Sequence, residues 1–90
     1  MSTPNLYPFS GFFIDSPAVY LIYDRQMNLI YIGQTNDLGR RMNEHRGDTS
    51  HLMHRHVPTY VAIEFIMDEA SRCARERQLI TQYAPPCNRC

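Results

Sequence analysis

The chain has 90 residues, enough for one domain with a modest core, because a chain of this length buries only about 60–65% of its unfolded surface. Its hydrophobic content of 43% argues against intrinsic disorder, and no apolar run approaches the length of a membrane span. The formal net charge is zero, so there is no overall basic field to attract nucleic acid.

The first part of the chain predicts an irregular arm followed by a β-hairpin. Residues 1–16 are rich in proline, glycine, serine and aromatic residues, and we expect an arm whose aromatic side chains pack on the core. β-branched runs at 18–23 and 29–34 flank a polar segment, which is typical of two strands joined by a turn. With an even number of residues between the paired ends, Tyr20 and Tyr31 share one face of the sheet.

The rest of the chain predicts three helices and one further strand. Short polar side chains, which cap helix N-termini, precede each predicted helix, and glycine or proline follows it. The order ββααβα, with helices packed on one face of a three-stranded antiparallel sheet, predicts a single α+β domain over residues 1–90. The caps are Thr35 to Asp37, Ser50 and Asp68, for helices at 38–46, 51–56 and 69–83, and the additional strand covers 59–66.

The three cysteines give little support for a metal site. Cys87 and Cys90 form one C-x-x-C pair, but a structural zinc site needs four ligands and no second pair is present. Cys73 and a histidine could complete a site, although nothing in the spacing requires it. An odd number of cysteines without a visible signal peptide suggests a reducing compartment, so we expect a cytoplasmic protein, nucleoid-associated if bacterial.

Arginine and histidine gather in one segment of the chain. All nine basic residues are arginine, and four of them lie with all four histidines between Arg40 and His56. A genome that prefers arginine codons explains the missing lysine but not the clustering. Arginine forks bind phosphate in a bidentate manner, so the segment is compatible with a phosphate-facing surface.

The last predicted helix carries a carboxylate on its apolar stripe. Cys73, Leu79 and Ile80 recur with helical spacing, and Glu76 lies on the same stripe. A core-facing carboxylate is rarely buried unless it is paired or binds a metal, and an ion pair with Arg41 is the structural alternative to metal binding. The opposite face is expected to carry mostly Arg72, Arg75, Arg77 and Gln82.

Six polar positions, taken in order, resemble a known family. The similarity is to the GIY-YIG nuclease superfamily, which includes the catalytic domains of excision-repair and homing-type endonucleases, and it covers about residues 17–89. Ala18 and Val19 replace the first glycine and the isoleucine of the name motif, and Gln34 stands where some members place a lysine. The matching residues are Tyr20, Tyr31-Ile32-Gly33, Arg41, His45, Glu76 and Asn88.

The resemblance implies metal-dependent hydrolysis of phosphodiester bonds, and the residue types suit that chemistry. Glu76 would bind Mg²⁺ or Mn²⁺, since Mg²⁺ keeps most of its waters and can take a single protein carboxylate. Arg41 would hold the scissile phosphate. Tyr20 would position or deprotonate the water, with Tyr31 and His45 completing the proton network. Transfer of the proton from tyrosine to His45 is the other route, because imidazole titrates near neutrality.

The remaining predicted roles concern substrate and support. Asn88 is assigned to the catalytic set and is expected to hydrogen-bond near Glu76 and hold the tail. Gly33 would allow close approach of backbone and substrate. The residues expected to bind substrate are Gly33, Gln34, Arg40, Arg46 and His54.

Different functional classes stay open at this stage. The leading hypothesis is a small DNA endonuclease module with low sequence specificity or selectivity for a DNA structure. The alternative is a non-catalytic nucleic-acid-binding domain that retains the fold, and a partner-binding domain is a third. We expect DNA as the partner, a larger repair or mobile-element assembly or a separate targeting domain, and no membrane.

Overall fold

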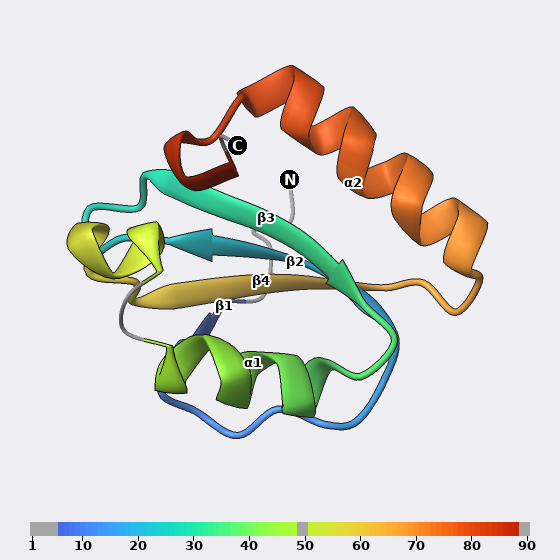
Figure 1. Cartoon of the computed structure of the whole chain (residues 1–90), viewed down its shortest axis with the longest axis horizontal. Coiled ribbons are helices and arrows are strands. Elements are labelled where there is room, and N and C mark those ends of the chain that lie inside the picture. Colours follow the sequence, from blue (N-terminus) through green and yellow to red (C-terminus); the bar gives the residue numbers. More distant parts are fainter. Residues whose placement is uncertain (1–5, 49–50, 89–90) are drawn as a thin grey trace.

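The computed structural model describes residues 6–48 and 51–88, and its centre is an antiparallel sheet covered by helices (Figure 1). The four strands lie in the order β1-β4-β2-β3. The central strands consist largely of β-branched and aromatic residues, which suit a pleated, buried surface. The elements are β1 (Leu6–Pro8), β2 (Ala18–Tyr23), β3 (Leu29–Thr35), α1 (Leu38–Gly47), the 3₁₀-helix η1 (Leu52–His56), β4 (Tyr60–Phe65), α2 (Glu69–Tyr83) and the 3₁₀-helix η2 (Pro86–Asn88).

The α+β class is confirmed, but the number of strands and helices differs from the prediction. The sheet has four strands rather than three because part of the expected arm pairs with β4, with Leu6 opposite Ala62. A proline in this strand is tolerated at a sheet edge, where its missing N–H is not needed. The predicted second helix is a short 3₁₀ segment, capped by the side chain of His51, which accepts from the N–H of Met53. The predicted cap Ser50 lies outside the described residues.

The helices cover both faces of the sheet, not one face as predicted. Successive strand residues point to opposite sides, so Ala18, Tyr20 and Ile22 face α1 while Val19 and Leu21 face α2. The sheet is therefore the middle layer between two small cores. The α1 core also contains Phe9, Phe13, Ile30, Leu38, Met42, Met53, Val61 and Cys87, and the α2 core contains Ile32, Ala62 and Leu79.

The arm is only partly packed on the core. Phe9 and Phe13 are buried, as expected of its aromatic residues, whereas Phe12 is 92% exposed. Arg46 of α1 holds the arm in place by donating to the backbone carbonyls of Phe9 and Gly11. The arm is thus fixed by a guanidinium as well as by apolar burial.

The hairpin register places the two tyrosines on one face. Tyr20 lies opposite Gly33, and Ile22 lies opposite Tyr31, so both phenols point toward α1. The side chain of Asp24 fixes the turn by accepting from two backbone N–H groups within it. The predicted shared face is therefore confirmed.

The free edge of β3 is closed by a side chain. Asn88 in η2 accepts from the N–H of Ile32 and donates to its carbonyl, both at 2.7 Å, as a neighbouring strand would. The turn that brings η2 back to the sheet follows Ala84, whose backbone is left-handed with φ 45°, and two prolines then prevent α2 from continuing. No helix among the described residues is long and apolar enough to cross a membrane.

Replacement of Asn88 by alanine should destabilise the domain, because the backbone N–H and carbonyl of Ile32 would lose their partners. We expect a loss of about 2 kcal/mol in the free energy of unfolding, typical of unsatisfied backbone groups. Urea titration followed by circular dichroism measures it. Gln82→Ala, at an exposed position of α2, is the control, and equal stability of the two variants would contradict the assigned role.

Candidate active site

Two tyrosines and two histidines form a compact cluster between the sheet and α1. The Tyr20 hydroxyl lies 2.8 Å from Nε2 of His45. The Tyr31 ring meets the rings of His45 and His51 edge to face, each with centroids 5.3 Å apart. Strands β2 and β3 supply the tyrosines and α1 supplies His45. This arrangement links two phenols and two imidazoles in one contact network.

Burial sets the protonation of this cluster. It raises the pKa of Tyr20 well above its usual range, an effect that Tyr31 strengthens and the guanidinium of Arg41 opposes. Burial also lowers the pKa of His45 to about 4, with Arg41 and His51 adding to the shift. At neutral pH Tyr20 is therefore a phenol, and His45 is a neutral imidazole whose Nε2 shares a hydrogen bond with the hydroxyl.

Gly33 makes room for the buried tyrosine. A Cβ at this position would lie 2.3 Å from the Tyr20 hydroxyl oxygen and 2.4 Å from the ring carbon that carries it. Tyr20 is 1% exposed, so its ring has little freedom to move aside. The glycine is thus explained by the packing of Tyr20, whereas the predicted approach of substrate stays a prediction.

Arg41 stands at the border of the cluster on α1. Its Nη1 lies 3.1 Å from Glu44, so its carboxylate partner is Glu44 and not Glu76, the partner considered from the sequence. Arg40 binds the other oxygen of Glu44 at 3.0 Å. Both guanidinium groups are about half exposed and remain accessible to an anion.

Glu76 approaches the cluster from α2. Its side chain is half-buried, and burial raises the pKa of its carboxyl, opposed by a hydrogen bond from the backbone of Gln34 and by the charge of Arg77. Its charge also contributes to the raised pKa of Tyr20, which places the two groups within electrostatic reach. The structure thus gathers five of the six predicted catalytic residues: Tyr20, Tyr31, Arg41, His45 and Glu76.

A divalent cation fits the carboxylate of Glu76. Burial disfavours its ionised form, which a cation would restore, and a carboxylate oxygen is the ligand type that Mg²⁺ and Mn²⁺ prefer. Within residues 6–48 and 51–88, no group of three or more His, Cys, Asp or Glu residues is arranged to hold a metal ion. Glu76 would therefore bind the cation together with water and substrate oxygens.

Three other predicted site residues have their polar groups engaged in the scaffold. Arg46 holds the arm, and Asn88 pairs with the backbone of Ile32. Nε2 of His54 lies 2.7 Å from the carbonyl oxygen of His45, and its ring stands edge-on to Phe9. These residues position the elements that carry the cluster.

Two residues near the site were not identified from the sequence. His51 is the histidine next to Tyr31, although the dense histidines of this segment drew attention to His54 instead. Arg72 was placed on the outer face of α2, but it is 4% exposed and donates from Nε to Gln34 at 3.1 Å. Its position four residues before Glu76 is the signal that could have placed it on the inner face.

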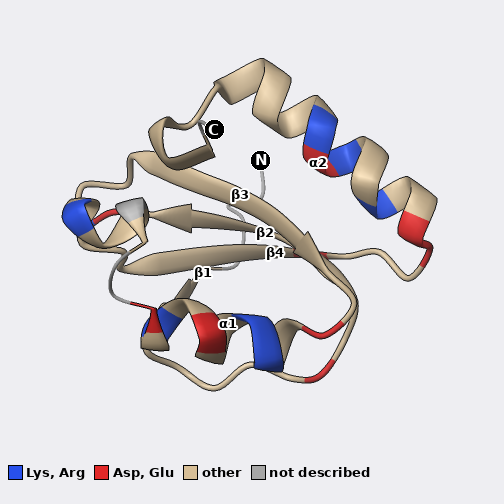
Figure 2. Ribbon diagram, viewed as in Figure 1, with Lys and Arg blue, Asp and Glu red and all other residues tan. Residues whose placement is uncertain are grey.

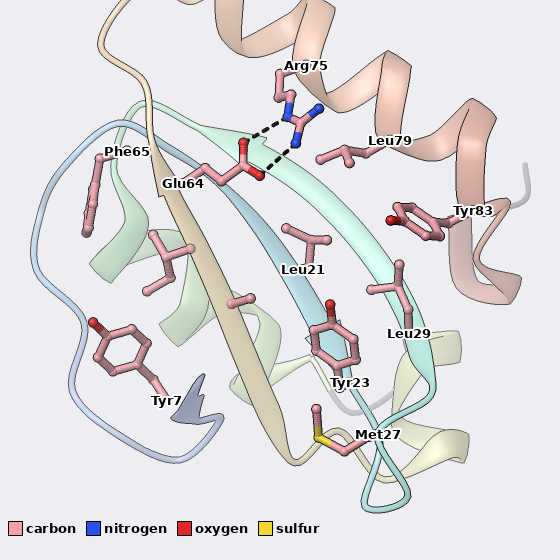
Figure 3. Close-up of a pocket in the computed structure, with 12 residues that line it drawn as sticks. Tyr7, Leu21, Tyr23, Met27, Leu29, Glu64, Phe65, Arg75, Leu79 and Tyr83 are labelled. Atoms are coloured by element: carbon pink, nitrogen blue, oxygen red, sulfur yellow. Dashed lines mark hydrogen bonds and ion pairs between the residues drawn. The ribbon is translucent and has the colours of Figure 1, made fainter. Parts of the chain in front are cut away.

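A separate apolar groove of about 480 Å³ lies on the α2 face of the sheet (Figure 3). Leu21, Tyr23 and Leu79 contribute to its lining, and the ion pair of Glu64 and Arg75, with N–O distances of 2.8 and 3.0 Å, lies at one end. None of the predicted site residues lines this groove. The chemistry-bearing groups thus gather elsewhere, around β3 and α1.

An antiparallel sheet covered by helices, with paired tyrosines, an arginine, a histidine and a glutamate close together, is the arrangement expected of a small α+β catalytic domain. Residues 16–89 match the family model of the GIY-YIG catalytic domain, and the chain belongs to this family. The fold resembles that of the N-terminal GIY-YIG endonuclease domain of UvrC from Thermotoga maritima, solved as a point mutant bound to its catalytic divalent cation. That similarity has a TM-score of 0.71 at 21% identity and covers 86% of this chain and 87% of the other.

Curated relatives are UvrABC system protein C sequences. The chain is 35% identical over 77 residues to the protein of Synechococcus sp. (strain JA-3-3Ab), covering 80% of this chain. It is 29% identical over 83 residues to the protein of Geotalea daltonii, covering 87% of this chain. The matched region is 12% and 13% of these relatives' lengths, so the similarity concerns one domain of much longer proteins.

Replacement of Gly33 by alanine should displace Tyr20. The added Cβ cannot occupy a position 2.3 Å from the hydroxyl, so we expect about 1–3 kcal/mol of destabilisation from overpacking. Gly47→Ala is the matched control, because a Cβ there meets nothing within 4 Å. Thermal unfolding of both variants measures the difference, and two equally stable proteins would refute the assigned packing.

Stability should fall on acidification because of His45. Its folded pKa of about 4 lies below the usual value near 6.5, so the unfolded chain binds the proton more readily. The contribution of neutral His45 is complete above about pH 6.5 and is lost as pH falls toward 4, with a slope of at most about 1.4 kcal/mol per pH unit. Urea unfolding between pH 4 and 8 should show a shallower dependence of stability on pH for His45→Gln than for wild type, and equal slopes would contradict the role assigned to His45.

Proposed function

We propose that this chain is a metal-dependent endonuclease domain that hydrolyses phosphodiester bonds of DNA. The observation that carries the proposal is the 2.8 Å hydrogen bond between Tyr20 and His45, set beside Tyr31, Arg41 and Glu76. A domain that only binds nucleic acid has no need of a buried phenol–imidazole pair facing a half-buried carboxylate.

The tyrosine–histidine pair would handle the proton of the attacking water. The Tyr20 hydroxyl lies 2.8 Å from Nε2 of a neutral His45. In the tautomer that leaves Nε2 unprotonated, Tyr20 can accept a proton from water while its own proton passes to the imidazole. A free phenolate, which burial opposes, need not persist. Tyr31 and His51 both contact the His45 ring edge to face. These contacts hold the imidazole next to the Tyr20 hydroxyl.

The charged groups would act on the phosphate. Arg41 can turn its guanidinium from Glu44 to the scissile phosphate and neutralise charge that develops in the transition state. A divalent cation at Glu76 would supply Lewis-acid stabilisation of the phosphate and of the leaving oxygen. The backbone of Gln34 lowers the pKa of Glu76 and so favours the ionised carboxylate that a cation requires.

Several features support DNA as a substrate with little sequence readout. Arg40 and Arg41 of α1 are about half exposed and suit backbone phosphates rather than bases. Figure 2 shows that α1 carries basic residues. Binding by so few contacts would be weak and salt-dependent, so selectivity would come from DNA structure or from a larger repair assembly of the kind that the relatives' name denotes. Free thiols at Cys73 and Cys87 suit our proposal of a cytoplasmic protein, associated with the nucleoid in a bacterium.

Cleavage of nicked, branched and duplex DNA in Mg²⁺ or Mn²⁺ tests the proposal. Glu76→Gln should abolish cleavage, and Tyr20→Phe should lower the rate about 10²- to 10⁴-fold, the usual contribution of a general acid–base group. Asp15→Asn, which removes an exposed carboxylate from the arm, should cleave like wild type. Wild-type protein that binds these substrates but cuts none of them would favour the non-catalytic binding domain.

A further inference from the structure

Residues at the end of β3, on α1 and in the first turn of α2 line a polar groove. Figure 1 shows the positions of these three elements. This β3-end groove has a volume of about 390 Å³, and its lining includes Gln34, Arg40, Arg41, Glu44 and Arg72. Three arginines and two glutamates line it, since Glu69 is also present, so one positive charge is in excess. Arg40 and Arg41 both form ion pairs with Glu44, whereas Arg72 forms none with a described carboxylate.

Arg72 is a buried cation with only neutral partners. Its Nε donates to the side-chain oxygen of Gln34 at 3.1 Å, and its Nη1 donates to the carbonyl of Met67 at 2.8 Å. No carboxylate forms an ion pair with it in residues 6–48 and 51–88. The charge of Arg72 helps to lower the pKa of Asp68, but the Asp68 carboxylate accepts from the N–H of Ser71.

The location of the Arg72 charge destabilises the folded state. Arg72 lies in the first turn of α2, where the helix dipole opposes a positive charge, and a buried charge without a counter-ion is destabilising. Among the described residues, Nη2 of Arg72 has no hydrogen-bond acceptor. Every fully buried side-chain polar atom in this part of the chain has a partner, so Nη2 is not fully buried. Because Arg72 lines the groove, an anion in the groove can reach Nη2.

Gln34 connects this cation to the proposed catalytic carboxylate. Its side-chain oxygen accepts from Nε of Arg72, and its backbone lowers the pKa of Glu76, which lies one helical turn after Arg72 on the same face of α2. The oxygen of the Gln34 amide accepts from Arg72, and its NH₂ group supplies two further N–H donors. A guanidinium N–H of Arg72 and the amide of Gln34 thus lie near Glu76, where the scissile phosphate would bind.

We propose that the β3-end groove binds a backbone phosphate of DNA adjacent to the phosphate that is cleaved, with Arg72 as its fixed cation. The inference rests on the proposed function for the identity of the substrate, but it concerns binding and not the chemical step. Arg72 is a phosphate-binding residue in this scheme, and Gln34 holds its guanidinium in position.

Binding of labelled single-stranded and duplex oligonucleotides, measured by fluorescence anisotropy without divalent cations, tests the proposal independently of cleavage. Arg72→Met should weaken binding about five- to eightfold at 0.1 M salt and reduce the slope of log K against log salt by about 0.7–0.9, the loss of one phosphate contact. Arg25→Gln is the charge-matched control, since Arg25 is exposed in the turn at the opposite end of the β2–β3 hairpin. It should leave both quantities close to wild type.

A second variant separates binding from folding. Gln34→Glu gives Arg72 a carboxylate partner at the position of the present 3.1 Å contact, so the folded state should be at least as stable as wild type. It should nevertheless bind DNA more weakly, because the guanidinium charge is neutralised within the protein. Thermal unfolding of each variant accompanies the binding measurements, and Gln34→Glu decides the question if Arg72→Met does not fold.

The possible outcomes distinguish the two proposals. Equal losses for Arg72→Met and Arg25→Gln, or wild-type binding by a folded Gln34→Glu variant, would overturn the phosphate site. Selective loss of binding in a protein that cleaves no substrate would support the site while rejecting the endonuclease. Failure of wild type to bind any oligonucleotide would overturn both.

Discussion

The buried phenol of Tyr20 is the constraint on which the rest of the site depends. Its ring fills the space that a side chain at Gly33 would need, and its hydroxyl meets His45 at 2.8 Å, so one residue ties β2, β3 and α1 together. The contact has an energetic reason as well as a geometric one, because a buried hydroxyl without a partner is costly. Burial of the pair then sets its protonation, with a neutral imidazole next to an intact phenol. The same contacts therefore determine both how Tyr20 packs and how the Tyr20–His45 pair is protonated.

The exposed edge of β3 explains how the two sides of the sheet are brought into one site. The tyrosines and His45 lie on the α1 face, whereas Glu76 comes from α2 on the other face. The two sides meet at the free edge of β3, where Asn88 of η2 pairs with the backbone of Ile32 and the backbone of Gln34 lowers the pKa of Glu76 of α2. The pairing by Asn88 satisfies part of an edge strand that could otherwise pair with another chain.

The sequence could predict whatever follows from local periodicity, and less of what depends on tertiary contacts. The hairpin, the shared face of Tyr20 and Tyr31 and the caps Asp37 and Asp68 follow from alternation and short polar side chains. The strand at 6–8 could not be predicted, because three residues carry no period and their pairing with β4 spans more than 50 positions. The roles of Arg46 and His54 were missed for a related reason: a basic side chain in a cluster looks free until backbone carbonyls are placed near it. The side of the sheet on which α2 packs is likewise set by the connection after β4, not by any pattern within the helix.

Tyr20 contributes both to the stability of the fold and to the proposed function, whereas Arg72 contributes to the proposed function at the expense of stability. Removal of the Tyr20 hydroxyl would leave the buried Nε2 of His45 without its hydrogen-bond partner, which costs about 1–3 kcal/mol, so stability alone would retain the pair. Arg72 offers folding no comparable gain, because its charge is buried among neutral acceptors at the unfavourable end of a helix. An apolar side chain of similar length would fill the same space without the electrostatic cost. A small domain with a modest core has little stability to spare, and a residue that works against it is best explained by an anion that arrives from outside.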